Sequence, residues 1–299
     1  MKRRNLTKSA WKSELIEGIG NKNTRRNYQS VLDSLEGHFH PFKGSETALQ
    51  LIRFIRAEQD KGISPQTAKQ RLSVLNNIIG FAKKTSFRSD NPVERSWIPK
   101  IKIETKPKCP TKQELNSLNK SLEHQTGFLG SRDRCMIGLM RYEALRVHEV
   151  SGLNHEDIKY HRDGIELTVK GKGGYQTEMQ LYPQSCKLIK DYKKFIPHDE
   201  QNGPLFIPLF QLGKRMDTRS IRKRCNQIFK DAGWRKGLSC HSLRHSLSIQ
   251  LLENGVPITE VSRKLRHRFL SSTFSYYSDV PSLRSPEKIN TAHKFLGGV

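Results

Sequence analysis

One segment of this sequence, residues 90–115, separates two regions in which apolar residues follow a helical pattern. The segment reads DNPVERSWIPKIKIETKPKCPTKQEL and combines prolines with repeated lysines. Proline lacks a backbone N–H and interrupts a helix, so this stretch is predicted to be a linker. A chain of 299 residues is long enough for two domains. We therefore place a boundary near residue 105 and predict domains at residues 1–105 and 106–299.

The first domain is predicted to be a small helical bundle. Its apolar residues recur at the spacing that places them on one helix face. Ser64 is the expected N-cap of the last helix, and Pro65 follows at the first helical position, where a missing N–H is tolerated. The helical patterns cover residues 23–39, 46–62 and 64–85.

The second domain is predicted to combine helices with a small antiparallel β-hairpin, which makes the fold mainly α with an α+β second domain. Thr111 and Glu114 form a capping box at its first helix. Residues 164–182, GIELTVKGKGGYQTEMQLY, contain two β-prone runs joined by a glycine-rich turn around Gly171. Further helices are predicted at residues 131–153, 185–196, 218–233, 241–255, 257–267 and 285–296.

The chain is strongly basic along its whole length. Lys and Arg number 53 against 29 Asp and Glu, which gives a formal net charge of +24. Such a surface attracts nucleic acid, because each phosphate that it neutralises releases condensed counterions. On charge alone, a ribosomal or solubilising role stays open. No apolar run approaches the roughly 20 residues that span a bilayer, and no apolar stretch follows the basic N-terminus, so a cytoplasmic protein is expected.

The spacing of two histidines raises the question of a metal site. His241 and His245 lie four residues apart on one predicted helix face, as in zinc-binding helices. Zinc helices of that kind carry a glutamate beside the first histidine, whereas Arg244 lies between the two here, and a cation disfavours a divalent metal. The five cysteines form no CxxC pair and are expected to be reduced thiols. We predict no metal and no cofactor, and expect Arg244, His241 and His267 to converge on an anion.

The order of these residues resembles the C-terminal signature of the tyrosine recombinases, the phage integrase family. The stretches HSLRHS, LLENGV and LRH, followed by a Ser- and Thr-rich turn that ends in tyrosine, match the family pattern in sequence order. Upstream, ALRVHEVSGLNHEDI resembles the first arginine motif of the family. VKGKGGYQTEMQL resembles the strand pair whose turn carries a catalytic lysine. The resemblance implies a helical core-binding domain at residues 1–105 and a catalytic domain at residues 106–299.

The resemblance also implies an activity: a site-specific recombinase or integrase that cleaves and rejoins DNA through a 3′-phosphotyrosyl intermediate, without metal or ATP. Two arginines would clamp the phosphate oxygens, two histidines would donate hydrogen bonds and help take the tyrosine proton, and a lysine would protonate the departing 5′-oxygen. Glu149 would support the first arginine. The residues implied to be catalytic are Arg146, Lys172, His241, Arg244, His267 and the nucleophile Tyr276.

Three positions depart from the family pattern. Arg266 replaces the glycine before the second active-site histidine, and we expect it to bind a neighbouring phosphate. Ala144 replaces the glycine two residues before Arg146, a change that packing is expected to tolerate. The tyrosine is doubled: Tyr276 has the common spacing of nine residues from His267, and Tyr277 has the spacing of some conjugative-element integrases. We predict Tyr276 as the nucleophile and keep Tyr277 as the alternative.

The resemblance implies that the chain binds double-stranded recombination sites, forms a tetramer on two such sites and is assisted by accessory DNA-bending proteins. The protein is expected to be nucleoid-associated and encoded by a mobile element or its host. The tail after residue 280 is expected to dock on a neighbouring subunit. The alternatives are a type IB-like topoisomerase and a non-catalytic DNA-binding accessory protein. Among other polar residues, Lys170 is expected to contact a phosphate, His245 to brace its helix, and His148 and His155 to be solvated.

Overall fold

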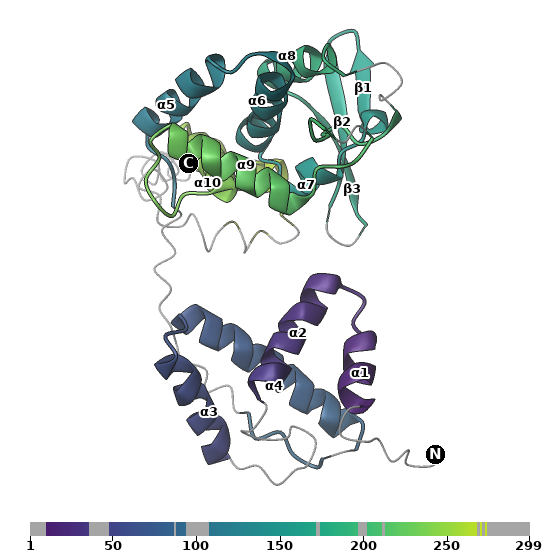
Figure 1. The fold of residues 1–299 in the computed structure, drawn as a ribbon, viewed down its shortest axis with the longest axis vertical. Coiled ribbons are helices and arrows are strands. Elements are labelled where there is room, and N and C mark those ends of the chain that lie inside the picture. Colours follow the sequence, from purple (N-terminus) through teal and green to yellow (C-terminus); the bar gives the residue numbers. More distant parts are fainter. Residues whose placement is uncertain are drawn as a thin grey trace, which may run out of the picture. The chain divides into compact units, whose positions relative to one another are not determined.

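The structure is a computed structural model that describes residues 10–35, 48–86, 88–93, 108–171, 174–196, 202–210 and 213–267, together with Leu270 and Thr273. The chain divides into two compact units, residues 1–104 and residues 105–299 (Figure 1). Among the described residues, no helix is both long and apolar enough to span a membrane.

The described part of the N-terminal unit is a helical bundle, and the three predicted helices are all present in it. Ser64 accepts a hydrogen bond from the Thr67 N–H at 3.2 Å, and Pro65 begins the helix after it, as predicted. An additional helix near the start was not predicted, because its eight residues are too few to show a periodic pattern. The helices are α1 (Ala10–Glu17), α2 (Lys22–Ser34), α3 (Ala48–Asp60) and α4 (Pro65–Lys84).

The core of this bundle lies along α4. Leu75, Ile78 and Ile79 are completely buried there, one helical turn apart on the face that meets the other helices. They pack against apolar residues of α2 and α3, which include Val31, Leu32, Leu51 and Phe54.

The C-terminal unit packs its helices against one face of a three-stranded antiparallel sheet, which lies at one edge of the unit (Figure 1). The capping box of Thr111 and Glu114 begins its first helix, as predicted. The strands, in sheet order, are β1 (Ile158–His161), β2 (Gly164–Lys170) and β3 (Gln176–Gln180). The helices are α5 (Lys112–Glu123), α6 (Gly127–Tyr142), α7 (Val147–Gly152), α8 (Pro183–Lys193), α9 (Thr218–Asp231), α10 (Cys240–Glu253) and α11 (Ile258–Lys264).

The predicted hairpin is the β2–β3 pair, in which Leu167 pairs with Met179 and Lys170 with Gln176. Alternate residues of β2 are buried, as expected for a strand with one face on the core: Ile165, Leu167 and Val169. Strand β1 was not predicted, because only one of its four residues is buried and the alternating pattern is lost.

The single helix predicted over residues 131–153 is wrong, because the chain turns between α6 and α7. Ala144 adopts the left-handed conformation with φ of 54°, which ends the helical path after Tyr142. Arg146 is extended and forms the N-cap of α7. Ala144 and Leu145 of the turn are buried and apolar, so they continue the hydrophobic periodicity on which the prediction rested.

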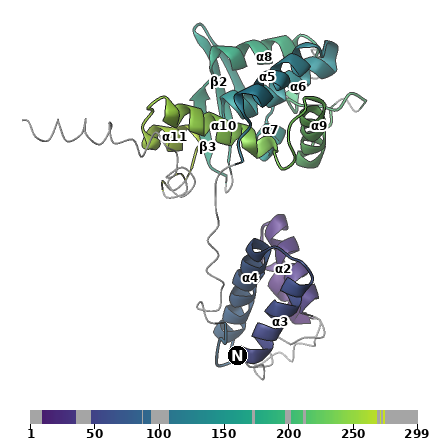
Figure 2. The ribbon, with the colours of Figure 1, turned by 90° about the vertical axis from the view of Figure 1, so that its left-hand side faces the viewer.

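The position of this turn is set by the core around it. Helix α6 is buried between α8 and α10, with Met136, Leu139 and Met140 completely enclosed. A second apolar cluster joins Ala144 of the turn to Leu252, Val261 and Leu265. Figure 2 shows α11 beside α10. The C-terminal end of α11 meets the α6–α7 turn, where Lys264 pairs with Glu143.

Candidate active site

The first predicted arginine is held by the short helix that it caps. The guanidinium Nη1 of Arg146 lies 2.8 Å from Glu149 Oε1, and the backbone N–H of Arg146 donates to Glu149 Oε2 at 2.8 Å. The Glu149 side chain is 2% exposed, whereas that of Arg146 is 30% exposed. The buried carboxylate therefore orients a guanidinium that still reaches solvent.

The second predicted arginine lies inside the unit. Arg244 is 2% exposed, and its two terminal nitrogens donate hydrogen bonds to the carbonyl oxygens of Ala144 and Leu265. Ala144 precedes Arg146 by two residues, and Leu265 precedes His267 by two. Arg244 thus ties together the two segments that carry the other predicted site residues.

The histidines of the predicted site gather around the two arginines. His267 lies directly after the end of α11, and its Nδ1 is 2.8 Å from Thr273 Oγ1. Burial, together with the nearby charges of Arg244 and Arg146, lowers the pKa of His267 to about 4. The rings of His241 and His245 meet edge to face with centroids 4.4 Å apart.

Those two histidines of α10 are likewise held neutral. Desolvation lowers the pKa of His245 to about 4, with the charges of His241 and Arg244 acting in the same direction. The pKa of His241 is also lowered, first by partial desolvation and then by Arg244 and Arg146. At neutral pH these imidazoles are uncharged, so each can accept a proton or donate a hydrogen bond.

A cavity of about 400 Å³ opens beside this cluster, with Arg146 and His241 in its wall. Arg222 and Asn226 of α9 line it as well. Neither residue was predicted, because on a basic amphipathic helix they look like ordinary surface residues; their shared helical face, four residues apart, was the available signal.

Two other expectations are wrong. The Arg266 side chain was expected at a neighbouring phosphate, but it is 9% exposed and pairs with Glu149 at 2.9 Å. His155 was expected to be solvated, but it is buried, and burial lowers its pKa to about 4. Lys170 pairs with Asp157 at 3.1 Å and with Glu156 at 3.7 Å while its side chain is 44% exposed, so its contact with a phosphate stays a prediction.

Lys172, Tyr276, Tyr277 and the tail helix predicted at residues 285–296 lie outside the described residues. The structure therefore brings together Arg146, Glu149, His241, Arg244 and His267. Within the described ranges, no group of three or more His, Cys, Asp or Glu side chains could hold a metal ion.

Comparison with known proteins places this arrangement in a family. The model of the phage integrase family matches residues 109–282. The tyrosine recombinase XerC of Chlamydia caviae is 28% identical over 241 residues, covering 80% of this chain and 74% of that protein. The tyrosine recombinase XerD of Caulobacter vibrioides is 28% identical over 242 residues, covering 78% of this chain and 77% of that protein.

Solved structures share the fold. The Tn1549 transposon integrase in complex with transposon right end DNA aligns with a TM-score of 0.74 at 16% identity, covering 96% of this chain and 98% of that one. The XerH site-specific recombinase bound to difH aligns with a TM-score of 0.68 at 19% identity, covering 86% of this chain and 76% of that one.

Because the family match spans more than half of the sequence, the chain belongs to the phage integrase family, the tyrosine recombinases, enzymes that cleave and rejoin DNA. The predicted fold class, mainly helical with a small antiparallel sheet, is confirmed.

Proposed function

We propose that this chain recombines two double-stranded DNA sites, cutting each strand with a tyrosine and joining it to the strand of the other site. The observation that supports this proposal is the convergence of Arg146, Glu149, His241, Arg244 and His267 from three separate segments. A cluster with more cations than carboxylates is suited to bind a phosphate, and the cavity beside Arg146 gives access to it.

The arginines would stabilise the transition state. Attack on a phosphodiester concentrates negative charge on the non-bridging oxygens, where a guanidinium can donate two parallel hydrogen bonds. Arg146 is held by Glu149 and reaches solvent, so it is placed to bind those oxygens directly. Arg244 supports the same site from within by holding the carbonyls of Ala144 and Leu265, and we propose that it also contacts the phosphate when DNA is bound.

The proton transfers would use neutral side chains. The tyrosine nucleophile, with an unperturbed pKa of about 10, must lose its proton as it attacks. His241 and His267 are uncharged at neutral pH and can help to take that proton. Because His267 Nδ1 already faces Thr273, its Nε2 is the nitrogen left for the substrate. Lys172 on the hairpin turn is proposed to protonate the departing 5′-oxygen.

The cycle as proposed needs no cofactor. The phosphotyrosyl bond retains the energy of the phosphodiester that it replaces, so the free 5′-hydroxyl can reverse the reaction without ATP or metal. We propose that Tyr276 forms this bond, that four copies of the chain assemble on two sites in the cytoplasm, and that accessory DNA-bending proteins assist. Integration or excision of a mobile element and resolution of two DNA copies both fit this chemistry.

The test is a nicked suicide duplex made from the DNA that flanks the gene of this chain. A recombinase should form a covalent protein–DNA adduct on it, with the same yield in excess chelator. Binding without an adduct would favour the accessory protein instead. Relaxation of supercoiled plasmids that lack the flanking sequence would favour the topoisomerase.

A further inference from the structure

Arg266 has a backbone conformation that few large residues adopt. It follows α11 and directly precedes His267, with φ of 51°. The left-handed region is unfavourable for a residue with a Cβ. Its side chain is nevertheless 9% exposed and directed into the protein. A strained, buried arginine next to an active-site histidine calls for compensating contacts.

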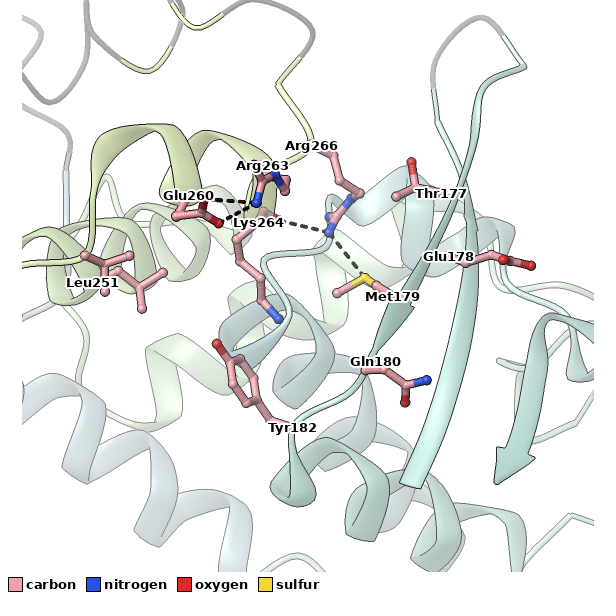
Figure 3. Close-up of a pocket in the computed structure, with 11 residues that line it drawn as sticks. Thr177, Glu178, Met179, Gln180, Tyr182, Leu251, Glu260, Arg263, Lys264 and Arg266 are labelled. Carbon is pink, nitrogen blue, oxygen red and sulfur yellow. Dashed lines mark hydrogen bonds and ion pairs between the residues drawn. The ribbon is translucent and has the colours of Figure 1, made fainter. Parts of the chain in front are cut away.

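Those contacts lie on the turn that carries Arg146. The Arg266 Nη2 donates to Glu149 Oε2 at 2.9 Å and to the Ala144 carbonyl at 3.0 Å. Its Nη1 donates to the Glu143 and Lys264 carbonyls, each at 3.2 Å. Figure 3 shows the same guanidinium extending from the end of α11 toward Met179 on β3.

Glu149 is shared between two arginines. Its Oε1 accepts from Arg146 Nη1, and its Oε2 accepts both from the Arg146 backbone N–H and from Arg266 Nη2. Burial favours the neutral acid, but the charge of Arg266, followed by the contacts of Arg146, holds the pKa of Glu149 below its ordinary value. Removal of Arg266 would therefore leave a buried carboxylate with Arg146 as its remaining ion-pair partner among the described residues.

The Ala144 carbonyl is shared in the same way. It accepts hydrogen bonds from Arg244 and from Arg266. One side chain immediately before His267 is thus bonded to both ends of the segment that presents Arg146, at Ala144 and at Glu149.

We propose that Arg266 is a positioning residue for DNA strand cleavage, which holds Glu149 and the Ala144 carbonyl so that Arg146 and His267 keep a fixed mutual geometry. This role rests on the proposed function. It differs from a general packing role, because the bonded groups are those that orient a phosphate-binding arginine. A displacement of about 1 Å in such a group can slow a reaction roughly 100-fold.

Lys264 provides a matched control. It comes from the same end of α11 and also reaches the α6–α7 turn, where its Nζ lies 2.6 Å from Glu143 Oε2. Its Nζ also lies 4.0 Å from the centroid of the Tyr182 ring, an arrangement visible in Figure 3. Lys264 therefore forms a buried ion pair between the same two segments, but with a carboxylate that does not hold Arg146.

The experiment compares Arg266→Met, Arg266→Lys, Arg266→Gly and Lys264→Met with the unmodified chain on the nicked flanking-DNA duplex. We expect Arg266→Met to slow single-turnover adduct formation about 10- to 100-fold with unchanged DNA affinity, and Arg266→Lys to recover part of the rate. Folded, DNA-bound Lys264→Met should form the adduct at the rate of the unmodified chain, even if its melting temperature is lower. Arg266→Gly removes the backbone strain, so it gives a folded variant without the guanidinium if the methionine variant is unstable.

A pH profile separates positioning from stability. The charged groups around Glu149 and its neighbour His148 are Arg146, Arg222 of α9, Arg244 of α10 and Arg266. Loss of Arg266 should raise the pKa of Glu149. The acidic limb of the pH profile for cleavage should therefore move to higher pH in Arg266→Met and Arg266→Gly. It should stay in place in Lys264→Met.

An unchanged rate and profile in the Arg266 variants, or an equal loss in Lys264→Met, would overturn the positioning role while leaving the recombinase intact. The absence of any adduct from the unmodified chain would instead overturn the proposed function, and this role with it.

Discussion

Two adjacent hydroxyls, those of Tyr276 and Tyr277, compete for the role of nucleophile. Consecutive residues on a helix would point about 100° apart, so we expect one of the two at most to attack the phosphate. The spacing of nine residues from His267 selects Tyr276. Tyr276→Phe should bind DNA normally and form no covalent adduct, whereas Tyr277→Phe should keep the adduct. Mass spectrometry of the trapped phosphopeptide decides the matter, and DNA attached to Tyr277 would reverse the assignment.

The two site arginines should differ in what they contribute to stability. Arg146→Ala and Arg244→Ala are both expected to slow cleavage by about 100-fold or more, because each removes charge from the transition state. Arg244→Ala should also lower the free energy of unfolding by about 3 kcal/mol, since it leaves two buried carbonyls without their charged donor. Arg146→Ala should cost about 1 kcal/mol, because its side chain is 30% exposed and Glu149 keeps Arg266.

Urea denaturation and binding measured on the same preparations check this difference. Equal stability losses in the two variants would show that Arg244 does not hold the Ala144 and Leu265 carbonyls in solution.

At the scale of single residues, the sequence predicts which residues gather at the candidate site better than it predicts where their side chains point. The motif spacing identified Arg146, Glu149, His241, Arg244 and His267, and the structure brings all of them together. The direction of Arg266 could not be predicted, because nothing local distinguishes a cation that binds DNA from one that binds a carboxylate 117 residues away in the sequence. His155 was misjudged for a related reason: its burial comes from the packed unit and not from its polar neighbours.

At the scale of elements, local signals predicted the helices and the hairpin where caps or alternation mark them. The caps at Ser64 and at Thr111 are side-chain hydrogen bonds within three residues, so the sequence contains them in full. The turn at Ala144 depends instead on distant parts of the chain, which supply its apolar neighbours and the hydrogen bonds from Arg244 and Arg266. Apolar periodicity continues through that turn, and a single helix was predicted in error.

The histidines near α10 and α11 should make the stability of the C-terminal unit depend on pH. Burial, reinforced by neighbouring positive charge, places the pKa of His245 and of His267 at about 4 in the folded state, below the unfolded value of 6.5. Between these values the unfolded chain binds more protons than the folded one. The stabilising contribution is therefore complete above pH 6.5 and is lost as the pH falls toward 4.

Thermal melting followed from pH 4 to pH 8 measures this dependence. His267→Asn should flatten the slope on the acidic side, and His155→Gln should do so independently, because the pKa of His155 is also about 4 and it lies outside the site. A melting temperature that does not change between pH 6.5 and pH 4 would contradict the assignment of buried, neutral imidazoles.

At the scale of the whole molecule, the positive charge suits a protein that binds DNA. A net charge of +24 allows many phosphate contacts beyond the active site. DNA binding should therefore weaken steeply with salt and should survive the loss of either Arg146 or Arg244. For this reason the rate of DNA cleavage tests the site better than DNA affinity does.

Assembly is the property that the tail is expected to control. Residues after 280 include an apolar set at helical spacing, Ile289, Ala292, Phe295 and Leu296, which we propose docks on a neighbouring copy. Burial of one large apolar side chain contributes about 1.5 to 3 kcal/mol, so loss of the tail should weaken synapsis of two DNA sites at least about tenfold. The chain should be monomeric without DNA, and truncation before Ser285 should spare binding to one site. Phe295→Asp in the otherwise unchanged chain should reproduce the defect, and mass photometry of the complexes would show it. A truncated protein that forms tetramers and recombines normally would refute the docking of the tail on a neighbouring copy.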